Sequence, residues 1–553
     1  MSNLKFIALS GTTDVTQNLY IYEYESDMII VDCGVGFPES DMYGVDLVIP
    51  DFSYIRKNRN KLKGVLVTHG HEDHLGALPF LLQDIEDGER VPIYSTKLVS
   101  GFIEDKFKDY GLEKKVEVFD PDKDDIKLGV FQITPFRTSH SVPDSVGYAI
   151  DTPEGRIFHI PDYKFDWTPV DGRPFDIPKL SKLAENGALM LASDSIGATN
   201  PGYTKSEKDI ENRVEEIAKK ASGSIFFTTI SSNISRMQQA INVALRLGRK
   251  VTFVGRSIEA KTKIAKNFGY MNFPDDALVP LKKATSLPRE KMMYIISGCY
   301  GQSGSSLDRV SLGQHDRVGA EEGDQVIFSA DPAPPGTKAA VDGVVDRFIG
   351  MNVEVHYYDL QEDLHVSGHG SQEDIKMLMS LVNPKYFVPV GGTIRHMRAY
   401  RDLAVAIGKD SNQVFELMPG DIVEFSGGSG KRNGKVESRL ILVDGLGIGD
   451  VGTHVLRDRK RLSEDGVAIV LLQIDKSQGR LIEMPEVISR GFVFEKSESE
   501  ILRDAGKSLG EEISKMKRVD STSAKKIASD YLERFFFKEI GRRPMVLPVV
   551  VEV

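Results

Sequence analysis

The sequence contains few cysteines and no long apolar run. Only two of its 553 residues are cysteine, Cys33 and Cys299, and two cysteines cannot build a disulfide framework. The chain also lacks a run of about eighteen apolar residues, the minimum for a helix that crosses a bilayer. Its first residues, MSNLKFIALSG, carry too little basic charge for a secretory signal. We therefore expect a cytoplasmic protein that does not associate with membranes.

Basic residues are also fewer than acidic residues. Lysine and arginine number 70 against 81 aspartate and glutamate residues, which gives a formal net charge of −11. Nucleic-acid-binding proteins usually show a basic excess, so the overall charge does not indicate such a partner. It does not exclude one, because a groove lined by metal ions can hold phosphates while the remaining surface stays acidic.

The order of the predicted elements indicates an α/β protein. Short apolar or alternating runs separated by Gly, Asp and Asn predict strands as far as about residue 160. From Thr204 helices alternate with strands, which is typical of βαβ units and a parallel sheet. The sequence TKSE at 204–207 fits a capping box and predicts a helix from Ser206. The segment SGGSGKRNGK at 426–435 has the composition of a flexible linker or a hairpin tip.

Histidine is scarce, yet three of the eleven histidines lie in the six residues HGHEDH at 69–74, directly behind a predicted strand. A turn at this strand end can direct His69 and His71 toward one metal ion while Asp73 and His74 face a second. Neutral imidazole and carboxylate groups are ligands that Zn²⁺ and Mn²⁺ accept. The alternative is a solvated loop with incidental histidines, which the clustering makes improbable.

A site for two metal ions needs further ligands from other parts of the chain. His140 in PFRTSHSVPDS and Asp162 in FHIPDYKFD each follow a predicted strand. Either residue alone is more typical of an ordinary polar loop. Together with the HGHEDH motif, both become candidate ligands.

Other motifs extend over nearly the whole chain. They are Asp32 in IIVDCG, SDSIGATNPGYTKSE, SSNISRMQQ, VGRS, HVSGHGS, GIGDVGTHVLRDRKRLSEDG and PEVISRGFVFEKSESEIL. In these and in the metal motifs the chain resembles bacterial ribonuclease J, of the β-CASP branch of metallo-β-lactamase-fold hydrolases. The resemblance implies an α/β fold: a metallo-β-lactamase αββα sandwich with an inserted β-CASP α/β domain and a small C-terminal α/β domain.

The resemblance also implies domain boundaries. The metallo-β-lactamase domain would occupy residues 1–205 and 355–425, with the β-CASP domain inserted at 206–354. A linker would span 426–449, and the C-terminal domain would span 450–553. Substrate would lie in the cleft between the first two domains.

By the same resemblance, two divalent metal ions are expected, Zn²⁺ with Mn²⁺ as the alternative. Three histidines, His69, His71 and His140, would hold one ion. The other would be held by Asp73 and His74, and Asp162 would bridge the two. Asp32 would orient the motif loop through hydrogen bonds. For a displacement at phosphorus with two metal ions, Asp73 would steer the proton of the nucleophile, and His369 is the candidate to protonate the leaving 3′-oxygen.

By the resemblance, three motifs supply residues that would line the path of the bound RNA, called the RNA track below. They are Ser232, Asn233, Arg256, His365, Val366, Ser367, Gly368 and His369. For Arg256 the alternative is a surface ion pair, and for His365 it is a structural role.

The chain departs from the family pattern in several places. Gly391 in PVGGT stands where the family has a ligand histidine, and His396 is the candidate replacement. Ser235 stands where the family has a histidine in SNIHR. Of the N-terminal glycine-rich motif, SGTTDVTQN keeps only Gly11 and Asn18.

These features together predict a metal-dependent ribonuclease with 5′→3′ exonuclease and endonuclease activity on single-stranded RNA. It would act in mRNA decay and rRNA processing, prefer a 5′-monophosphate end, and form a homodimer or homotetramer, within an RNA-decay complex. Three alternatives are a weakened RNA-binding subunit that supports an active paralogue, a small-molecule metallo-hydrolase, and a DNA-directed nuclease. The sequence leaves open the RNA targets and the balance of exo- and endonuclease activity.

Overall fold

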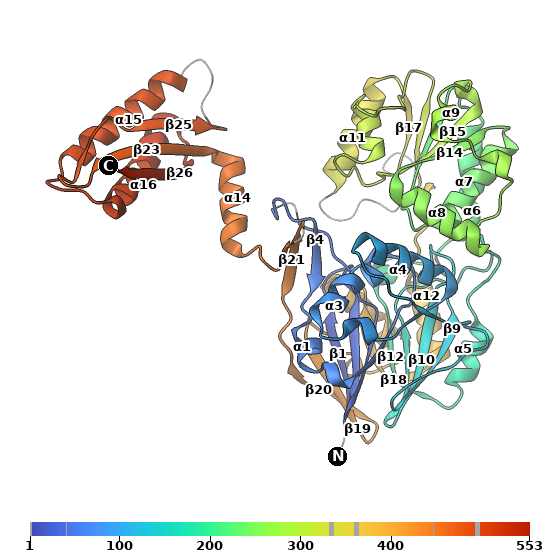
Figure 1. Cartoon of the computed structure of the whole chain (residues 1–553). Helices are drawn as coiled ribbons and strands as arrows, with labels where there is room; N and C mark the ends of the chain where they lie inside the picture. The colour runs from blue at the N-terminus through green and yellow to red at the C-terminus, as the bar shows by residue number, and fades with distance from the viewer. Residues whose placement is uncertain (1–2, 40, 331–336, 359–363, 446, 493–497) are drawn as a thin grey trace. The chain divides into compact units, whose positions relative to one another are not determined.

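A computed structural model describes residues 3–39, 41–330, 337–358, 364–445, 447–492 and 498–553 (Figure 1). The chain forms two compact units, which are described separately. The first comprises residues 1–37 and 48–441, and the second comprises residues 38–47 and 442–553. In the described part of the chain, no helix has the length and apolar character needed to traverse a bilayer.

Two mixed β-sheets form the base of the first unit. The eight-stranded sheet has the order β20-β19-β1-β2-β3-β5-β6-β7 and the six-stranded sheet the order β18-β12-β11-β10-β9-β8. Strands of the larger sheet are β1 (Leu4–Ser10), β2 (Leu19–Tyr24), β3 (Asp27–Val31), β5 (Leu62–Leu66), β6 (Ile93–Ser95), β7 (Glu117–Val118), β19 (Asp421–Ser426) and β20 (Ser429–Lys435). Strands of the smaller sheet are β8 (Ile126–Leu128), β9 (Phe131–Arg137), β10 (Val146–Thr152), β11 (Gly155–Ile160), β12 (Ala188–Asp194) and β18 (Pro384–Val390).

The main core lies between these sheets. Buried aromatic and branched side chains from both sheets pack together, among them Phe6 and Tyr20 from one sheet and Phe131 and Tyr148 from the other. Helices flank the two sheets: α1 (Ser53–Lys57), α2 (Glu72–Leu75), α3 (Leu78–Asp84), α4 (Lys97–Asp109), α5 (Ile177–Ala184), α12 (Gln372–Val382) and α13 (Ile394–Ala406). This arrangement is the expected αββα sandwich.

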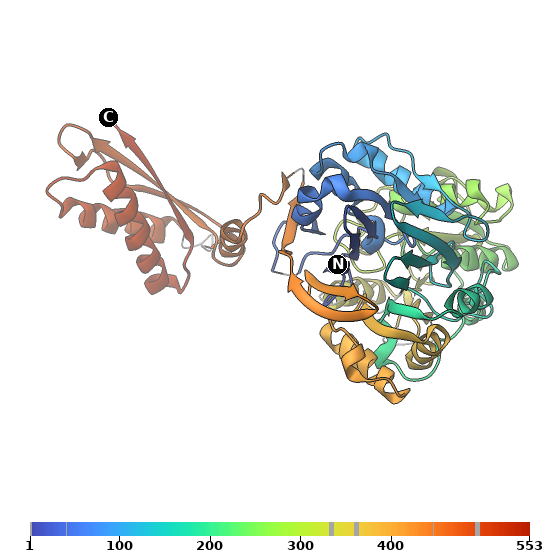
Figure 2. The ribbon, with the colours of Figure 1, turned by 90° about the horizontal axis from the view of Figure 1, so that it is seen from below.

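The hairpin of β19 and β20 completes the larger sheet. Its strand β19 pairs antiparallel with β1, so segments from the two ends of this unit lie side by side, orange beside blue in Figure 2. Gly427 and Gly428, both with positive φ, form the turn. The segment predicted as a linker at 426–449 thus contains β20, β21 (Leu440–Asp444) and β22 (Gly447–Ile448). The composition of this segment suited a linker or a hairpin, and the structure has the hairpin.

A parallel sheet with its own helices lies between β12 and β18 in the sequence. Its five strands have the order β14-β15-β13-β16-β17 and are β13 (Ile225–Thr228), β14 (Lys250–Val254), β15 (Met292–Ile296), β16 (Gln325–Phe328) and β17 (Glu354–His356). The helices are α6 (Lys208–Ala218), α7 (Ile234–Arg246), α8 (Arg256–Phe268), α9 (Leu281–Ala284), α10 (Ser306–Ser311) and α11 (Lys338–Gly350). The βαβ pattern predicted from Thr204 onward is confirmed.

The predicted capping box at 204–207 is wrong, because its residues are engaged elsewhere. Helix α6 begins at Lys208, and the Thr204 hydroxyl donates to the backbone oxygen of His369. The Glu207 carboxylate accepts from the fully buried Arg236 at 2.7 Å and lies 3.2 Å from Lys164 Nζ. Burial opposes ionisation of Glu207, but the two cations hold its pKa at about 2. The contact between Lys164 and Glu207 joins the sandwich to the inserted domain, and Arg236 holds Glu207 in place from within the inserted domain.

The second unit is a small α/β domain. In its sheet β23 (Val467–Asp475) pairs antiparallel with β24 (Arg480–Leu481) and β25 (Glu486–Arg490), and parallel with β26 (Met545–Glu552). Its helices are α14 (Thr453–Asp465), α15 (Glu498–Ser514) and α16 (Ser521–Ile540). Apolar residues of α15 and α16 pack against alternate residues of β23. Strand β4 (Leu47–Pro50) lies at the sequence junction of the two units.

Candidate metal centre

Strand ends from both sheets of the sandwich carry the predicted ligands. The HGHEDH motif begins three residues after β5, and His71 is the residue that precedes helix α2. Asp73 and His74 therefore lie in the first turn of that helix. His140 lies in the connection between β9 and β10, and Asp162 follows β11 by two residues.

The structure brings three histidines and one aspartate together in a buried cluster. His71 Nδ1 lies 3.2 Å from His69 Nε2 and 3.1 Å from His140 Nε2. Asp162 Oδ2 lies 3.5 Å from each of His69 Nε2 and His140 Nε2. Ligands about 2.0–2.1 Å from a tetrahedral Zn²⁺ are separated from one another by roughly 3.3–3.4 Å. The donor set therefore fits a divalent cation.

Each of these imidazoles is held by its other ring nitrogen. The partners are Thr68 Oγ1 at 3.0 Å from His69 Nδ1, Ser141 Oγ at 3.2 Å from His71 Nε2, and the Gly368 backbone oxygen, which accepts from His140 Nδ1 at 2.7 Å. Burial lowers the pKa of His69 and of His71 well below the usual value, and that of His140 to about 4. All three rings are thus neutral near pH 7, the state in which imidazole binds metal.

A second group of potential metal ligands also lies beside Asp162. His74 Nε2 is 3.5 Å from Asp162 Oδ2 and 3.5 Å from Asp73 Oδ2. His74 Nδ1 donates to Asp32 Oδ2 at 2.8 Å, and Asp32 also accepts from the backbone N–H and the hydroxyl of Thr68 at 2.8 Å each. Asp32 thereby directs the other ring nitrogen of His74 toward the donor group.

Asp194 is a residue of the centre that the sequence reasoning missed. It is the last residue of β12, and its Oδ2 lies 2.7 Å from His369 Nδ1. The same His369 nitrogen lies 4.0 Å from Asp162 Oδ2, so the three side chains form one cluster. The signal that could have identified Asp194 is its place at the end of the apolar strand ALMLASD, which parallels the place of Asp162 after β11.

Gly391 leaves open space next to this cluster. It directly follows β18, has a φ of +70°, and donates its N–H to the backbone oxygen of Gly11 at 2.8 Å. A Cβ at this position would lie 3.9 Å from Asp194 Oδ1 and 4.0 Å from Asp162 Oδ1. His396, the candidate replacement, instead caps helix α13, with Nδ1 3.2 Å from the backbone nitrogen of Thr393.

Comparison with known proteins identifies the family. Curated relatives include Ribonuclease J2 of Bacillus subtilis strain 168, 34% identical over 100% of this chain and 99% of the relative, and Ribonuclease J 2 of Staphylococcus aureus strain NCTC 8325, 34% identical over 100% and 98%. The chain belongs to the ribonuclease J family. Family models agree: the ribonuclease J β-CASP domain matches residues 222–348 and the ribonuclease J C-terminal domain residues 454–553.

Two further models match other parts of this ribonuclease J family member. The β-lactamase superfamily domain matches residues 28–177, and the Zn-dependent metallo-hydrolase RNA specificity domain matches residues 355–414. A solved structure, a protein of unknown function from Enterococcus faecalis V583, is similar in fold, with a TM-score of 0.53 and 14% identity over 76% of this chain and all of that chain. Membership of the family makes the protein a metal-binding, RNA-binding hydrolase of the nuclease class.

The metal centre of this ribonuclease J family member opens into a cleft of about 720 Å³. Residues from the sandwich and from the inserted domain line this cleft together. Five of the residues expected on the RNA track are among them: Ser232, His365, Val366, Ser367 and His369. Lys205 and Lys261 add positive charge to the lining.

The other three residues expected on the track lie elsewhere. The Asn233 side chain accepts from the backbone N–H of Arg236 and caps α7. Arg256 is exposed at the start of α8. Gly368 lies against His140, where a Cβ would approach the imidazole to 2.6 Å. Gly368 thus supports a candidate metal ligand by close backbone approach.

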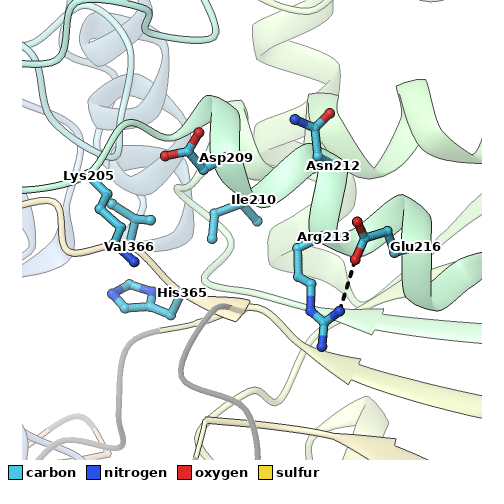
Figure 3. A pocket seen from close by; sticks show the side chains of 8 residues that line it. All are labelled: Lys205, Asp209, Ile210, Asn212, Arg213, Glu216, His365 and Val366. Atoms are coloured by element: carbon cyan, nitrogen blue, oxygen red, sulfur yellow. Dashed lines mark hydrogen bonds and ion pairs between the residues drawn. The ribbon is translucent and has the colours of Figure 1, made fainter.

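A smaller hollow of about 420 Å³ adjoins the cleft beside α6. Lys205, His365 and Val366 line both cavities, and Figure 3 shows Lys205 and His365 facing each other. Arg213 lies further along this hollow and pairs with Glu216 at 3.0 Å. An RNA strand that leaves the cleft in this direction would meet both basic and acidic side chains, because Asp209 and Glu216 also line the hollow.

Proposed function

We propose that the protein is a ribonuclease that degrades single-stranded RNA from the 5′ end and also cleaves it internally, in cytoplasmic mRNA decay and rRNA processing. The buried cluster of His69, His71, His140 and Asp162 at the floor of a cleft carries this proposal. The test combines metal analysis of the purified protein with digestion of 5′-labelled single-stranded RNA. Metal-dependent release of 5′-monophosphate products supports the proposal, and undigested RNA with a fully metal-loaded protein contradicts it.

Two divalent cations, Zn²⁺ with Mn²⁺ as the alternative, fit the donors on the two sides of Asp162. His69, His71 and His140 would hold the first, Asp73 and His74 the second, and Asp162 would contact both. When bound, such a pair of cations supplies a nucleophile at neutral pH and neutralises charge at the phosphorus.

The side chains of this site can move the protons that hydrolysis requires. Asp73 lines the cleft beside Asp162, so its carboxylate is placed to accept a proton from the attacking water. His369, held by Asp194, lines the cleft and is placed to protonate the leaving 3′-oxygen. This assignment gives products with a 5′-phosphate and a 3′-hydroxyl.

RNA with a 5′-monophosphate should be degraded at least several-fold faster than the same RNA with a 5′-triphosphate. A pocket formed by Ser232, Ser367 and His369 has hydroxyl and imidazole groups for one terminal phosphate and would crowd three. The measurement compares initial rates on two RNAs that differ only at the 5′ end. Equal rates on both would contradict a terminal-phosphate pocket.

The second unit offers a surface for assembly of the chain into a homodimer or homotetramer. Helices α15 and α16 cover one face of its sheet, whereas Ile469, Ile488, Leu547, Val549 and Val551 on the other face are 37–46% exposed. A contiguous apolar face of this kind is typical of a protein–protein interface. A second copy of the chain is the occupant that we propose, since most soluble oligomers are homo-oligomers.

Val549→Lys should shift the protein from oligomer to monomer, because a charged side chain on the apolar face would be buried without a partner on assembly. Light scattering after size-exclusion chromatography measures the mass of the assembly. Val455→Lys is the control, since Val455 is an exposed valine on α14, outside this sheet. A wild-type protein that stays monomeric at every concentration would contradict the assembly.

Gly391 favours a second candidate function, that of a weakly active subunit that binds RNA within an RNA-decay complex and supports an active paralogue. The missing imidazole removes one donor that the family places beside Asp162 and Asp194. Assays of the purified chain alone separate the two functions. Turnover of RNA by the chain alone supports the enzyme, and RNA binding without turnover supports the subunit.

A further inference from the structure

We propose that Asn18 supplies the ligand that Gly391 lacks, and that its side-chain oxygen completes the binding site of a second divalent cation with His74, Asp73 and Asp162. This inference rests on the proposed function only in requiring a second cation. It assigns a residue that comes from the turn before β2, far in sequence from the metal motifs.

The position of Asn18 among the second group of donors carries the proposal. Its side chain is buried, and its terminal amide lies 3.0 Å from His74 Nε2 and 3.5 Å from Asp73 Oδ2. His74 Nε2 in turn lies 3.5 Å from Asp73 Oδ2 and from Asp162 Oδ2. These separations match those between ligands that share one cation, as they do in the histidine cluster nearby.

A chain of hydrogen bonds connects Asn18 to the position of the missing histidine. The N–H of Gly391 donates to the backbone oxygen of Gly11 at 2.8 Å. The Tyr20 hydroxyl lies 2.9 Å from that same oxygen and 2.8 Å from Asn18 Oδ1. A Cβ on Gly11 would come within 2.4 Å of the Tyr20 hydroxyl, so only glycine fits there. Gly11 and Asn18, the two retained residues of the glycine-rich motif, are thus both part of this network.

The Tyr20 hydroxyl has one proton, which it can donate either to Asn18 Oδ1 or to the Gly11 backbone oxygen. Each choice goes with a different orientation of the Asn18 amide. When Asn18 Nδ2 faces His74, the hydroxyl donates to Asn18 Oδ1, and no proton joins Tyr20 to Gly11. After a half-turn, Asn18 Nδ2 donates to the Tyr20 oxygen, and the Tyr20 proton goes to the Gly11 oxygen. The half-turn also breaks the hydrogen bond that Asn18 Nδ2 donates to the Asp73 backbone oxygen at 3.2 Å. Asn18 Oδ1 then faces His74 Nε2, the carboxylate of Asp73 and that backbone oxygen, an arrangement of acceptors that a cation stabilises.

The donor set also indicates which cation this position selects. It contains one imidazole, two carboxylates and one amide oxygen, whereas the first cluster contains three imidazoles and one carboxylate. Oxygen-rich sets suit Mn²⁺, and nitrogen-rich sets suit Zn²⁺. We therefore expect the first position to take Zn²⁺ and the position beside Asn18 to prefer Mn²⁺.

The experiment counts cations in the absence of RNA. Protein stripped by a chelator and reloaded with one equivalent of Zn²⁺ is titrated with Mn²⁺ by calorimetry, and the metal content is measured after dialysis. Wild-type protein should bind one Mn²⁺ per chain. Asn18→Ala should weaken this step at least 10-fold and leave the Zn²⁺ content unchanged, since loss of even an indirect partner of a ligand costs about 10–100-fold.

Three further variants support the test, and Asn18→Asp keeps it decisive if Asn18→Ala disturbs the fold. Asn18→Asp keeps the size of the side chain and adds an anionic oxygen, so it should bind Mn²⁺ more tightly than the wild type. Asn242→Ala, at an asparagine that bonds with Gln238 on α7, is the matched control and should behave as the wild type. Gly391→His in the Asn18→Ala background should restore the Mn²⁺ step.

Several results would overturn the assignment. They are wild-type Mn²⁺ affinity in Asn18→Ala, no gain in Asn18→Asp, or wild-type protein that takes up no Mn²⁺. Failure of the proposed ribonuclease activity would leave these metal titrations intact, because they contain no RNA. Conversely, a ribonuclease whose Asn18→Ala variant still binds both cations would retain the function and lose this inference.

Discussion

Replacement of both His69 and His71 by alanine should abolish RNA hydrolysis while the affinity for RNA changes little. The double variant removes two of the four donors that lie 3.1–3.5 Å apart in the first cluster. A centre that supplies several kcal/mol of transition-state stabilisation gives at least about 10³-fold in rate. We expect the affinity for RNA to come mainly from the other residues that line the cleft, because of the two replaced histidines only His71 lines it.

Single-turnover cleavage of 5′-labelled RNA and fluorescence anisotropy measure the two quantities, with metal content determined on the same samples. His454→Ala is the control, because this histidine is exposed on α14 and pairs with Arg457. Full activity of the double variant on single-stranded RNA would rule out a metal-dependent reaction at this site. Loss of RNA binding in parallel would assign the histidines to substrate affinity.

Asp194→Asn and His369→Ala should each lower kcat by about 10²–10⁴-fold with a much smaller change in KM, the range for loss of a general acid. The carboxylate of Asp194 lies 2.7 Å from His369 Nδ1 and fixes the orientation of the ring. Because the two residues act as one unit, the double variant should be hardly slower than either single variant.

The leaving group provides the specific check on this pair. An RNA with sulfur in place of the leaving 3′-oxygen needs no proton on departure, so the variants should cleave it at nearly the wild-type rate. A structural role for the pair would slow both substrates equally. Equal slowing would therefore contradict proton donation by His369 and leave only a supporting role.

Sequence patterns predicted those parts of the molecule that depend on local chemistry. Apolar strand runs with polar residues at their ends located the HGHEDH motif, His140 and Asp162. These residues were expected to lie close together because strand ends meet at one edge of a sheet. The alternation after Thr204 predicted the parallel sheet of the inserted domain. Periodicity needs no knowledge of distant partners, which is why these predictions agree with the fold.

The features that the sequence did not reveal depend on contacts between distant segments. Asn18 and His74 are separated by 56 positions, yet their side chains lie 3.0 Å apart. The predicted capping box failed for the same reason, because Glu207 bonds with Arg236 from another helix. The side chain of Asn233, a residue expected on the RNA track, caps helix α7. Such pairings follow from topology, which local patterns do not encode.

The buried ion pairs around Glu207 have a consequence for experiments at different salt concentrations. Dissolved ions weaken attractions between exposed charges and have little access to buried pairs, so we expect the contact between Lys164 of the sandwich and Glu207 of the inserted domain to persist as the ionic strength rises. The affinity for single-stranded RNA falls over the same range, with a logarithmic slope of about −0.7 for each phosphate neutralised. An ionic-strength series therefore counts the phosphates that the cleft holds while this contact between the two domains persists.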